Sequence, residues 1–381
     1  MLYHYFPDVS GPAPIRTFWL HGYLSVDLFF ILSGFVMALN YGGAFAADFS
    51  VKTYADFLWK RLGRVYPLYI VVTLAMAAHA YAVGVAQKSP SAWTLISNIL
   101  LVQAWGFADC LGGPTWSIST EFAAYLLFPV LVATILLGRR AWSWLAAAGA
   151  VFILVLVATR SLAELNQIYD GVTARNGPLD VFGIFTTYPL LRCLGGFILG
   201  VVTFRIAQHP AAQRLAGRRF AGDIALLAVV AVMAVPGSDI ALMILFVPLV
   251  LALAAQRSLA ARTLGTRAIY WLGLVSFSIY LMHCPVEGLF RKPLTAGLSA
   301  LPLPHAAWMA GVVMVGLLFA CSAATYYGIE KPARDWSRNL MRRRPRFTSQ
   351  PAAVAPLWSP GKPASHSLAP VRLEPRSQSE V

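Results

Sequence analysis

Long apolar stretches alternate with short polar connections along most of this chain. A hydrocarbon core about 30 Å thick requires roughly 20 consecutive, mainly apolar residues of helix. The run at 93–107 is apolar but has only about 15 residues, so it is too short to cross. Nine stretches reach or approach the required length, and the pair near 221–255 is the shortest. They predict transmembrane helices at 24–41, 66–86, 119–138, 141–158, 181–204, 221–236, 239–255, 268–288 and 306–328.

Composition supports an all-α, polytopic integral membrane protein. The chain has 381 residues, of which 58% are hydrophobic and 12% charged. Soluble domains carry roughly 25% charged residues, so a soluble globule, a disordered chain and a nucleic-acid-binding domain are all disfavoured. The four cysteines have no paired spacing and no metal-binding pattern, and we interpret them as packing residues.

Positive charge is concentrated in alternate loops. Residues 42–65, 139–140, 205–220, 256–267 and 329–381 hold 23 of the 30 Lys and Arg residues, and the opposite loops hold six. Because cytoplasmic loops carry the excess of Lys and Arg, these five segments, including the C-terminus, are predicted to be cytoplasmic. The net charge of +14 then reflects a basic cytoplasmic face rather than nucleic-acid binding. The same orientation leaves 93–107 as a re-entrant or interfacial piece on the outer side.

The two ends of the chain differ from the span region. Residues 1–335 are expected to form one membrane domain. Residues 336–381 are expected to be a basic, disordered cytoplasmic tail, because 342–346 read Arg-Arg-Arg-Pro-Arg and the rest is rich in Pro, Ser and Ala. Residues 1–6 resemble the outer end of a further helix, most of which is absent from this sequence.

Ionisable residues inside a span are costly and are functional candidates by default. The predicted orientation places His4, Asp27, Glu121 and His283 in the outer half of the membrane. Two imidazoles and two carboxylates at similar depth could form a general-base site that removes a proton from a hydroxyl group. Alternatively, each carboxylate caps a helix or makes an interhelical hydrogen bond.

A second group of charges is predicted near the inner surface. Arg61 and Arg64 are three residues apart, so they share a helix face and could clamp a phosphate, although a plain positive-inside anchor is the simpler interpretation. Arg192 lies deep in a predicted span and needs a buried partner or an anionic ligand. Gly34, and the glycines of 195–200, are interpreted as helix-packing contacts. Together, the two layers fit an anionic cytoplasmic donor with an outer hydroxyl acceptor, or a proton-coupled transporter.

Several motifs together resemble one known family. The more specific are SVDLFFILSGF at 25–35 and PTWSISTE at 114–121; the others are LYHY at 2–5, RLGRVYP at 61–67, SFSIYLMH at 276–283 and IEKP at 329–332. This set resembles membrane acyltransferase family 3, whose members O-acylate bacterial surface polysaccharides and exopolysaccharides. The resemblance runs from residue 1 to about residue 335.

The resemblance implies about ten transmembrane helices with both ends cytoplasmic, which matches nine complete spans and a truncated first one. It also implies acyl-CoA, in particular acetyl-CoA, as co-substrate, with no metal. His4 would be the catalytic base, and Arg61 and Arg64 would lie at the acyl-CoA phosphates. Glu121 would support the active site.

Other residues would assist this site. Asp27 is a further catalytic candidate from its position, and Trp116 and Ser117 belong to the motif of Glu121. The donor that stabilises the oxyanion stays open among Ser117, Tyr280 and Arg192, and His283 is a candidate for substrate or structural support.

The sequence departs from the family pattern in two places. The family carries an Arg eleven positions before the first-helix His, and in this chain that position would lie upstream of Met1. Ser25 stands where the family more often has Gly.

Three functional hypotheses follow. The leading one is an O-acyltransferase of the bacterial inner membrane that modifies a glycan, with the polysaccharide biosynthesis machinery as an expected partner. The others are a transporter of a glycan or lipid-linked precursor, and an inactive family member that lacks the first-helix Arg. Nothing in the sequence shows the internal repeat that many secondary transporters carry.

Overall fold

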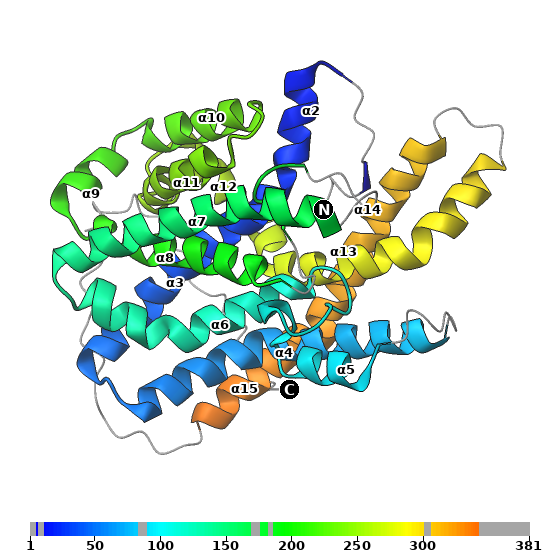
Figure 1. Cartoon of the computed structure of the whole chain (residues 1–381), viewed down its shortest axis with the longest axis horizontal. Coiled ribbons are helices and arrows are strands. Elements are labelled where there is room, and N and C mark those ends of the chain that lie inside the picture. The colour runs from blue at the N-terminus through cyan, green and yellow to red at the C-terminus, as the bar shows by residue number, and fades with distance from the viewer. Residues whose placement is uncertain are drawn as a thin grey trace, which may run out of the picture.

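All regular secondary structure is helical in the part of the chain that the computed structural model describes, which comprises residues 5–6, 11–82, 90–168, 176–181, 186–300 and 306–342 (Figure 1). Its long helices run in alternating directions and pack side by side. They are α3 (Ser25–Ala47), α4 (Val51–Ala82), α6 (Thr115–Leu131, extended by a π-turn at Val132–Leu136), α7 (Arg140–Ile168), α8 (Tyr188–Ala207), α10 (Ala221–Met233), α11 (Asp239–Ala254), α13 (Arg267–Ser299) and α14 (Ala306–Thr325, extended by a π-turn at Tyr326–Glu330).

Each of the nine predicted spans corresponds to one of these helices, which confirms an all-α polytopic membrane protein. Among the described residues, seven helical segments are long and apolar enough to cross a membrane. The remaining two, α10 and α11, have 13 and 16 residues and are therefore only about 20 and 24 Å long. A count of ten spans is thus not confirmed. Such short helices need a locally thinner bilayer or flanking polar side chains that reach the membrane interface.

The run at 93–107 does not form a spanning helix. It folds into α5 (Ala92–Ile99) and the 3₁₀ turn η2 (Gln103–Trp105), separated by Leu101 with a φ of 62°. Buried Asn98 holds the returning chain, because its side-chain amide donates to Asp109 O at 2.8 Å and accepts from Leu111 N at 3.0 Å. Side-chain partners of this kind allow irregular backbone inside a membrane protein.

Helices α3 and α8 pack with almost no side-chain layer between their backbones. A β-carbon on Gly34 would collide with the carbonyl oxygen of Phe197, and one on Gly200 would collide with that of Ile31. The predicted packing role of these glycines is confirmed, since close backbone approach is what small residues permit between membrane helices. Helix α8 is consequently the most enclosed of the candidate spans.

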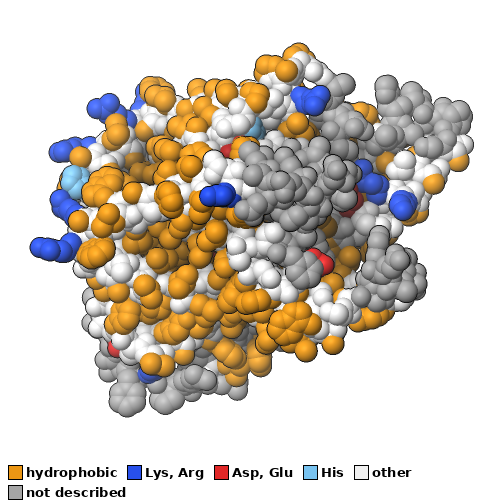
Figure 2. Space-filling model, viewed as in Figure 1, with side chains coloured by type: hydrophobic (Ala, Val, Ile, Leu, Met, Phe, Trp, Pro, Cys, Tyr) orange, Lys and Arg blue, Asp and Glu red, His pale blue; other side chains and the backbone are white. Residues whose placement is uncertain are grey.

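The basic loops gather at one end of the bundle. Gly42, Leu136 and Phe204 lie together there, and Gly222 lies against Ser258. We call this the Arg-rich end; it comprises the connections at 48–50, 137–139, 208–220 and 255–266. Figure 2 shows Lys and Arg side chains clustered at the left edge and an apolar surface over much of the remaining face. Segregated charge beside an apolar belt is the arrangement of a protein that lies across a bilayer.

Four short helices were not predicted, because they are too short to produce an apolar run. They are α2 (Ala13–Leu20), α9 (Pro210–Ala216), α12 (Leu259–Leu264) and α15 (Lys331–Arg342). Helix α15 packs on α4, where Trp59 Nε1 donates to Ser337 O at 3.4 Å. The expected domain boundary at residue 335 therefore falls inside a helix, and residues 343–381 lie outside the described part.

Candidate functional site

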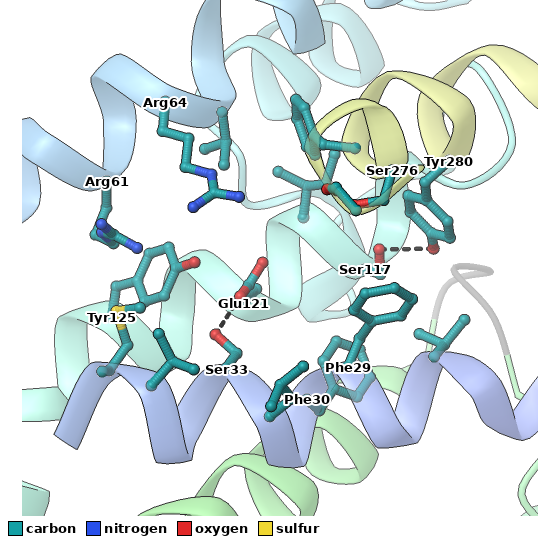
Figure 3. A pocket seen from close by; sticks show the side chains of 18 residues that line it. Phe29, Phe30, Ser33, Arg61, Arg64, Ser117, Glu121, Tyr125, Ser276 and Tyr280 are labelled. Atoms are coloured by element: carbon teal, nitrogen blue, oxygen red, sulfur yellow. Dashed lines mark hydrogen bonds between the residues drawn. The ribbon is translucent and has the colours of Figure 1, made fainter. Parts of the chain in front are cut away.

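A cavity of about 370 Å³ opens between α3, α4, α6 and α13 (Figure 3). Figure 3 shows Arg61 and Arg64 reaching down from α4 toward Glu121 and Tyr125 on α6, with Ser117 and Tyr280 at the other side of the view. The cavity therefore joins four of the sequence motifs, those at 25–35, 61–67, 114–121 and 276–283. Its lining is Val26, Phe29, Phe30, Leu32, Ser33, Val36, Met37, Arg61, Arg64, Val65, Ser117, Ile118, Glu121, Tyr125, Gly273, Ser276, Phe277 and Tyr280.

Two guanidinium groups form the cationic part of the cavity. The predicted shared face of Arg61 and Arg64 is confirmed, because both belong to helix α4 and line the same space. Arg61 donates to the hydroxyl of Tyr41 at 2.9 Å, but its Nε is buried without a hydrogen-bond partner. Among the ion pairs of the described residues, none involves Arg61 or Arg64. Unused guanidinium donors facing a cavity suit an anionic ligand such as a phosphate.

Glu121, predicted in the outer layer with Asp27 and His283, lines the same cavity as Arg61 and Arg64 of the predicted inner layer. Helix α6 begins at Thr115 rather than at residue 119, so Glu121 is about 9 Å along the helix instead of at its entrance. Its carboxylate accepts a hydrogen bond from Ser33 on α3. Tyr125 stands one helical turn further on and also lines the cavity. Ser33 and Tyr125 were not predicted as site residues. The four-residue spacing could have identified Tyr125, because it places Tyr125 on the same helix face as Glu121.

A pair of hydroxyl groups lies in the part of the cavity formed by α13. Tyr280 donates to Ser117 Oγ at 2.7 Å, and Ser117 donates to Pro114 O at 3.1 Å. His283 follows one turn later on α13, with Nδ1 at 2.5 Å from Tyr280 O. The structure thus brings together Ser117 and Tyr280, two motif residues that are 163 positions apart in the sequence.

Tyr5 is the described residue of the first motif, LYHY at 2–5. Its hydroxyl donates to His283 O at 2.9 Å, and its ring is buried against Val286, Met314 and Leu318. The neighbouring His4, the predicted catalytic base, lies outside the described residues. The position of Tyr5 puts residues 5–6 at the level of His283 on α13.

Asp27 and Arg192 satisfy each other. Arg192 Nε donates to Asp27 Oδ1 at 2.8 Å and Nη2 to Oδ2 at 2.5 Å, and the side chains are 2% and 0% exposed. Arg192 also donates to Val181 O at 2.9 Å, and its guanidinium stacks over the ring of Trp116 at 5.4 Å. The predicted need of Arg192 for a buried partner is confirmed. Asp27 is therefore bound to Arg192 and does not line the cavity, and Trp116 packs against Arg192.

A second buried acid was missed. Asp239, at the start of α11, accepts from the hydroxyl of Tyr23 and from Leu179 N at 2.7 Å, and its Oδ1 lies 3.5 Å from His21 Nε2. His21 and Asp239 are 1% and 0% exposed. The available signal was an acidic residue at the first position of an apolar run, which the membrane tolerates only with a partner.

Comparison with known proteins is consistent with these motifs. A family model described as "Acyltransferase domain" matches residues 1–327. Acyltransferase MdmB of Streptomyces mycarofaciens is 30% identical over 211 residues, which cover 52% of this chain and 50% of that protein. Exopolysaccharide production protein ExoZ of Rhizobium meliloti is 26% identical over 318 residues, covering 82% of this chain and 89% of that protein.

A third relative, protein 2 in the picA locus of Rhizobium radiobacter, is 32% identical over 125 residues, which cover 28% of this chain and 64% of that protein. The aligned part thus spans about half of MdmB and under two thirds of this third relative. No solved structure matches the chain.

Proposed function

This chain belongs to the acyltransferase family whose model covers residues 1–327, and on that premise we propose that it is an O-acyltransferase that moves an acyl group, specifically acetyl, from acyl-CoA to a hydroxyl group of a glycan. The observation that carries the proposal is the cavity that places two arginines, a carboxylate and a pair of hydroxyl groups along one path. A donor with a polyanionic head and a thioester at the end of a flexible arm suits that order of groups.

Arg61 and Arg64 bind the phosphates of the donor. A guanidinium offers a planar set of N–H donors that matches phosphate oxygens. The Nε–H of Arg61 has no hydrogen-bond partner and can donate to a phosphate. The acyl arm then lies between Phe29 and Phe30 on one side and α13 on the other, because those apolar walls continue the cavity toward Ser117. Glu121, held by Ser33, lines the same cavity as the two arginines.

Transfer requires a base for the acceptor and donors for the oxyanion. His4 removes the proton from the glycan hydroxyl, whose oxygen attacks the thioester carbonyl; the C–S bond then breaks and coenzyme A leaves as a thiol after taking up a proton. Arg192 is engaged by Asp27 and Val181, so Tyr280 and Ser117 are the oxyanion donors. To donate, each hydroxyl turns its hydrogen from its present acceptor, Ser117 Oγ or Pro114 O, toward the oxyanion. Tyr280→Phe should lower kcat about 10²–10³-fold.

The Arg-rich end faces the cytoplasm of a bacterial inner membrane, which places Arg61 and Arg64 on the side where acyl-CoA is made. The acceptor is a glycan outside or in export. This part of the proposal is supported by the name of ExoZ, an exopolysaccharide production protein that the chain matches over most of its length.

Coenzyme A binding tests the proposal and separates it from a transporter, which has no need of the cofactor. Binding of coenzyme A to the full chain in lipid nanodiscs would be measured by calorimetry. R61Q/R64Q should weaken binding at least about tenfold, since each charge-assisted hydrogen bond contributes about 1.5–3 kcal/mol. R262Q/R267Q is the matched control, because both arginines are exposed, at the Arg-rich end or directly after it, and neither lines this cavity. Equal binding by all three proteins, or none by wild type, would overturn the donor site.

A further inference from the structure

A second cavity, of about 270 Å³, lies at the Arg-rich end between the start of α7, the end of α8 and α9. Its lining is Arg140, Ser143, Trp144, Val202, Arg205, Ile206, His209 and Ala212, and it shares no residue with the first cavity. The left edge of Figure 2, where these elements end, carries the densest group of Lys, Arg and His side chains in that view. The proposed donor chemistry does not use this cavity.

The polar part of this second cavity is cationic. Arg205 uses Nη1 to donate to Leu136 O at 2.7 Å, which leaves most of its five N–H groups for another acceptor. His209 Nδ1 accepts from Ala211 N at 3.3 Å, so the proton of a neutral ring is on Nε2 and is available to a ligand. Within the described part of the chain, no carboxylate is ion-paired with Arg140, Arg205 or His209. The cavity therefore presents three donors to an anion.

The rest of the cavity is apolar and continues onto the surface that faces lipid. Val202, Ile206 and Ala212 form apolar walls, and Trp144 is 67% exposed on α7. Next to it, Leu145 is 61% exposed in a helix that is among the least enclosed candidate spans. Tryptophan at the end of a span is typical of the interface between lipid headgroups and acyl chains. A ligand that fits both parts has an anionic head and an apolar tail.

We propose that this cavity binds the headgroup of an anionic phospholipid. The phosphate accepts hydrogen bonds from Arg140, Arg205 and His209, and an acyl chain lies along the exposed face of α7 beside Trp144 and Leu145. The volume lies just below the roughly 300–1,000 Å³ typical of small-molecule sites, so it suits a headgroup better than a whole cofactor. Basic pockets between membrane helices at the headgroup level bind anionic lipids in this way. The inference needs only that the Arg-rich end lies at a membrane surface and does not depend on the acyltransferase proposal.

Native mass spectrometry of the full chain in detergent micelles tests the site. Phosphatidylglycerol would be titrated against phosphatidylcholine, and inorganic phosphate would be added alone as the soluble source of the same anion. R140Q/R205Q should bind phosphatidylglycerol at least about tenfold more weakly, and wild type should prefer it to phosphatidylcholine. The matched control is R218Q/R219Q, which removes the same charge from exposed positions outside the cavity and should change binding by less than about threefold.

Arg205 also supports Leu136, so Arg140→Gln alone is the second variant, because it removes one cavity donor without touching that hydrogen bond. It should reduce phosphatidylglycerol binding and leave the thermal unfolding temperature unchanged. An equal loss in R218Q/R219Q and R140Q/R205Q would show general surface attraction and overturn the proposal. Saturation of the site by inorganic phosphate, with no preference for the lipid, would overturn it as well.

Discussion

The buried pair of Asp27 and Arg192 gives the sharpest test of how this fold positions its site. Two hydrogen bonds join the side chains across 165 positions of the sequence, and neither is more than 2% exposed. Asp27→Asn leaves the guanidinium without its counter-charge in an apolar interior. Arg192→Met leaves a lone carboxylate there, together with an unsatisfied Val181 O.

The expected magnitude follows from these contacts. Removing one partner of a buried ion pair costs about 3–5 kcal/mol of unfolding free energy, because an uncompensated charge remains. Replacing both partners with apolar residues removes that penalty, so Asp27→Leu with Arg192→Met should cost only about 1–3 kcal/mol, the cost of the buried, unsatisfied Val181 carbonyl. The double variant should therefore be more stable than Arg192→Met alone.

The measurement is unfolding of the purified protein in detergent micelles by titration with denaturant, analysed as a double-mutant cycle. Arg160→Met is the control, since Arg160 is an exposed arginine on α7. Single variants that unfold within about 1 kcal/mol of wild type would refute the structural role. If Asp27→Asn abolished acyl transfer without changing stability, the predicted catalytic role of Asp27 would replace its structural role.

Three further outcomes are expected. His4→Ala in the full chain should lower glycan acylation about 10²–10⁴-fold while the protein stays in the membrane, and normal acylation would remove His4 from the mechanism. Gly200→Ala should destabilise the protein by about 1–3 kcal/mol, because the added β-carbon would collide with the carbonyl of Ile31. Gly149→Ala is the control and should not destabilise it, because the space around Gly149 is open. Equal unfolding midpoints for the two variants would contradict the close packing of α3 and α8. Arg61→Lys keeps the charge but loses the planar donor set, so KM for acyl-CoA should rise with little change in kcat, and steady-state kinetics showing the reverse would place Arg61 in the chemical step.

The contacts of Arg192 also show how the interior supports the cavity. Its guanidinium stacks on Trp116, and Trp116 packs edge-on against Phe30 at 6.0 Å between ring centroids. Phe30 lines the cavity next to Ser117. The ion pair thus fixes the mutual position of α3, α6 and α8. A substitution of Asp27 or Arg192 should therefore alter the cavity through packing rather than through direct contact.

The sequence by itself determined the membrane class, the order of the nine long helices and the shared face of Arg61 and Arg64. Each of these depends on local pattern: an apolar run sets where a helix can lie, and a spacing of three residues sets which side chains are neighbours. The family motifs likewise depend on contiguous residues. Hydropathy is less informative about helix ends, which is why α6 starts four residues earlier than predicted and Glu121 lies deeper than expected.

Only the tertiary structure decided which polar groups meet. Asp27 and Glu121 are equally conspicuous in the sequence, yet one is buried against Arg192 and the other shares a cavity with Arg61. The difference arises from how α3 rotates and slides against α6 and α8, which Gly34 and Gly200 set by allowing backbone contact. A helix carries its polar residues around its circumference, so its neighbours determine which residue faces a cavity and which faces a buried partner.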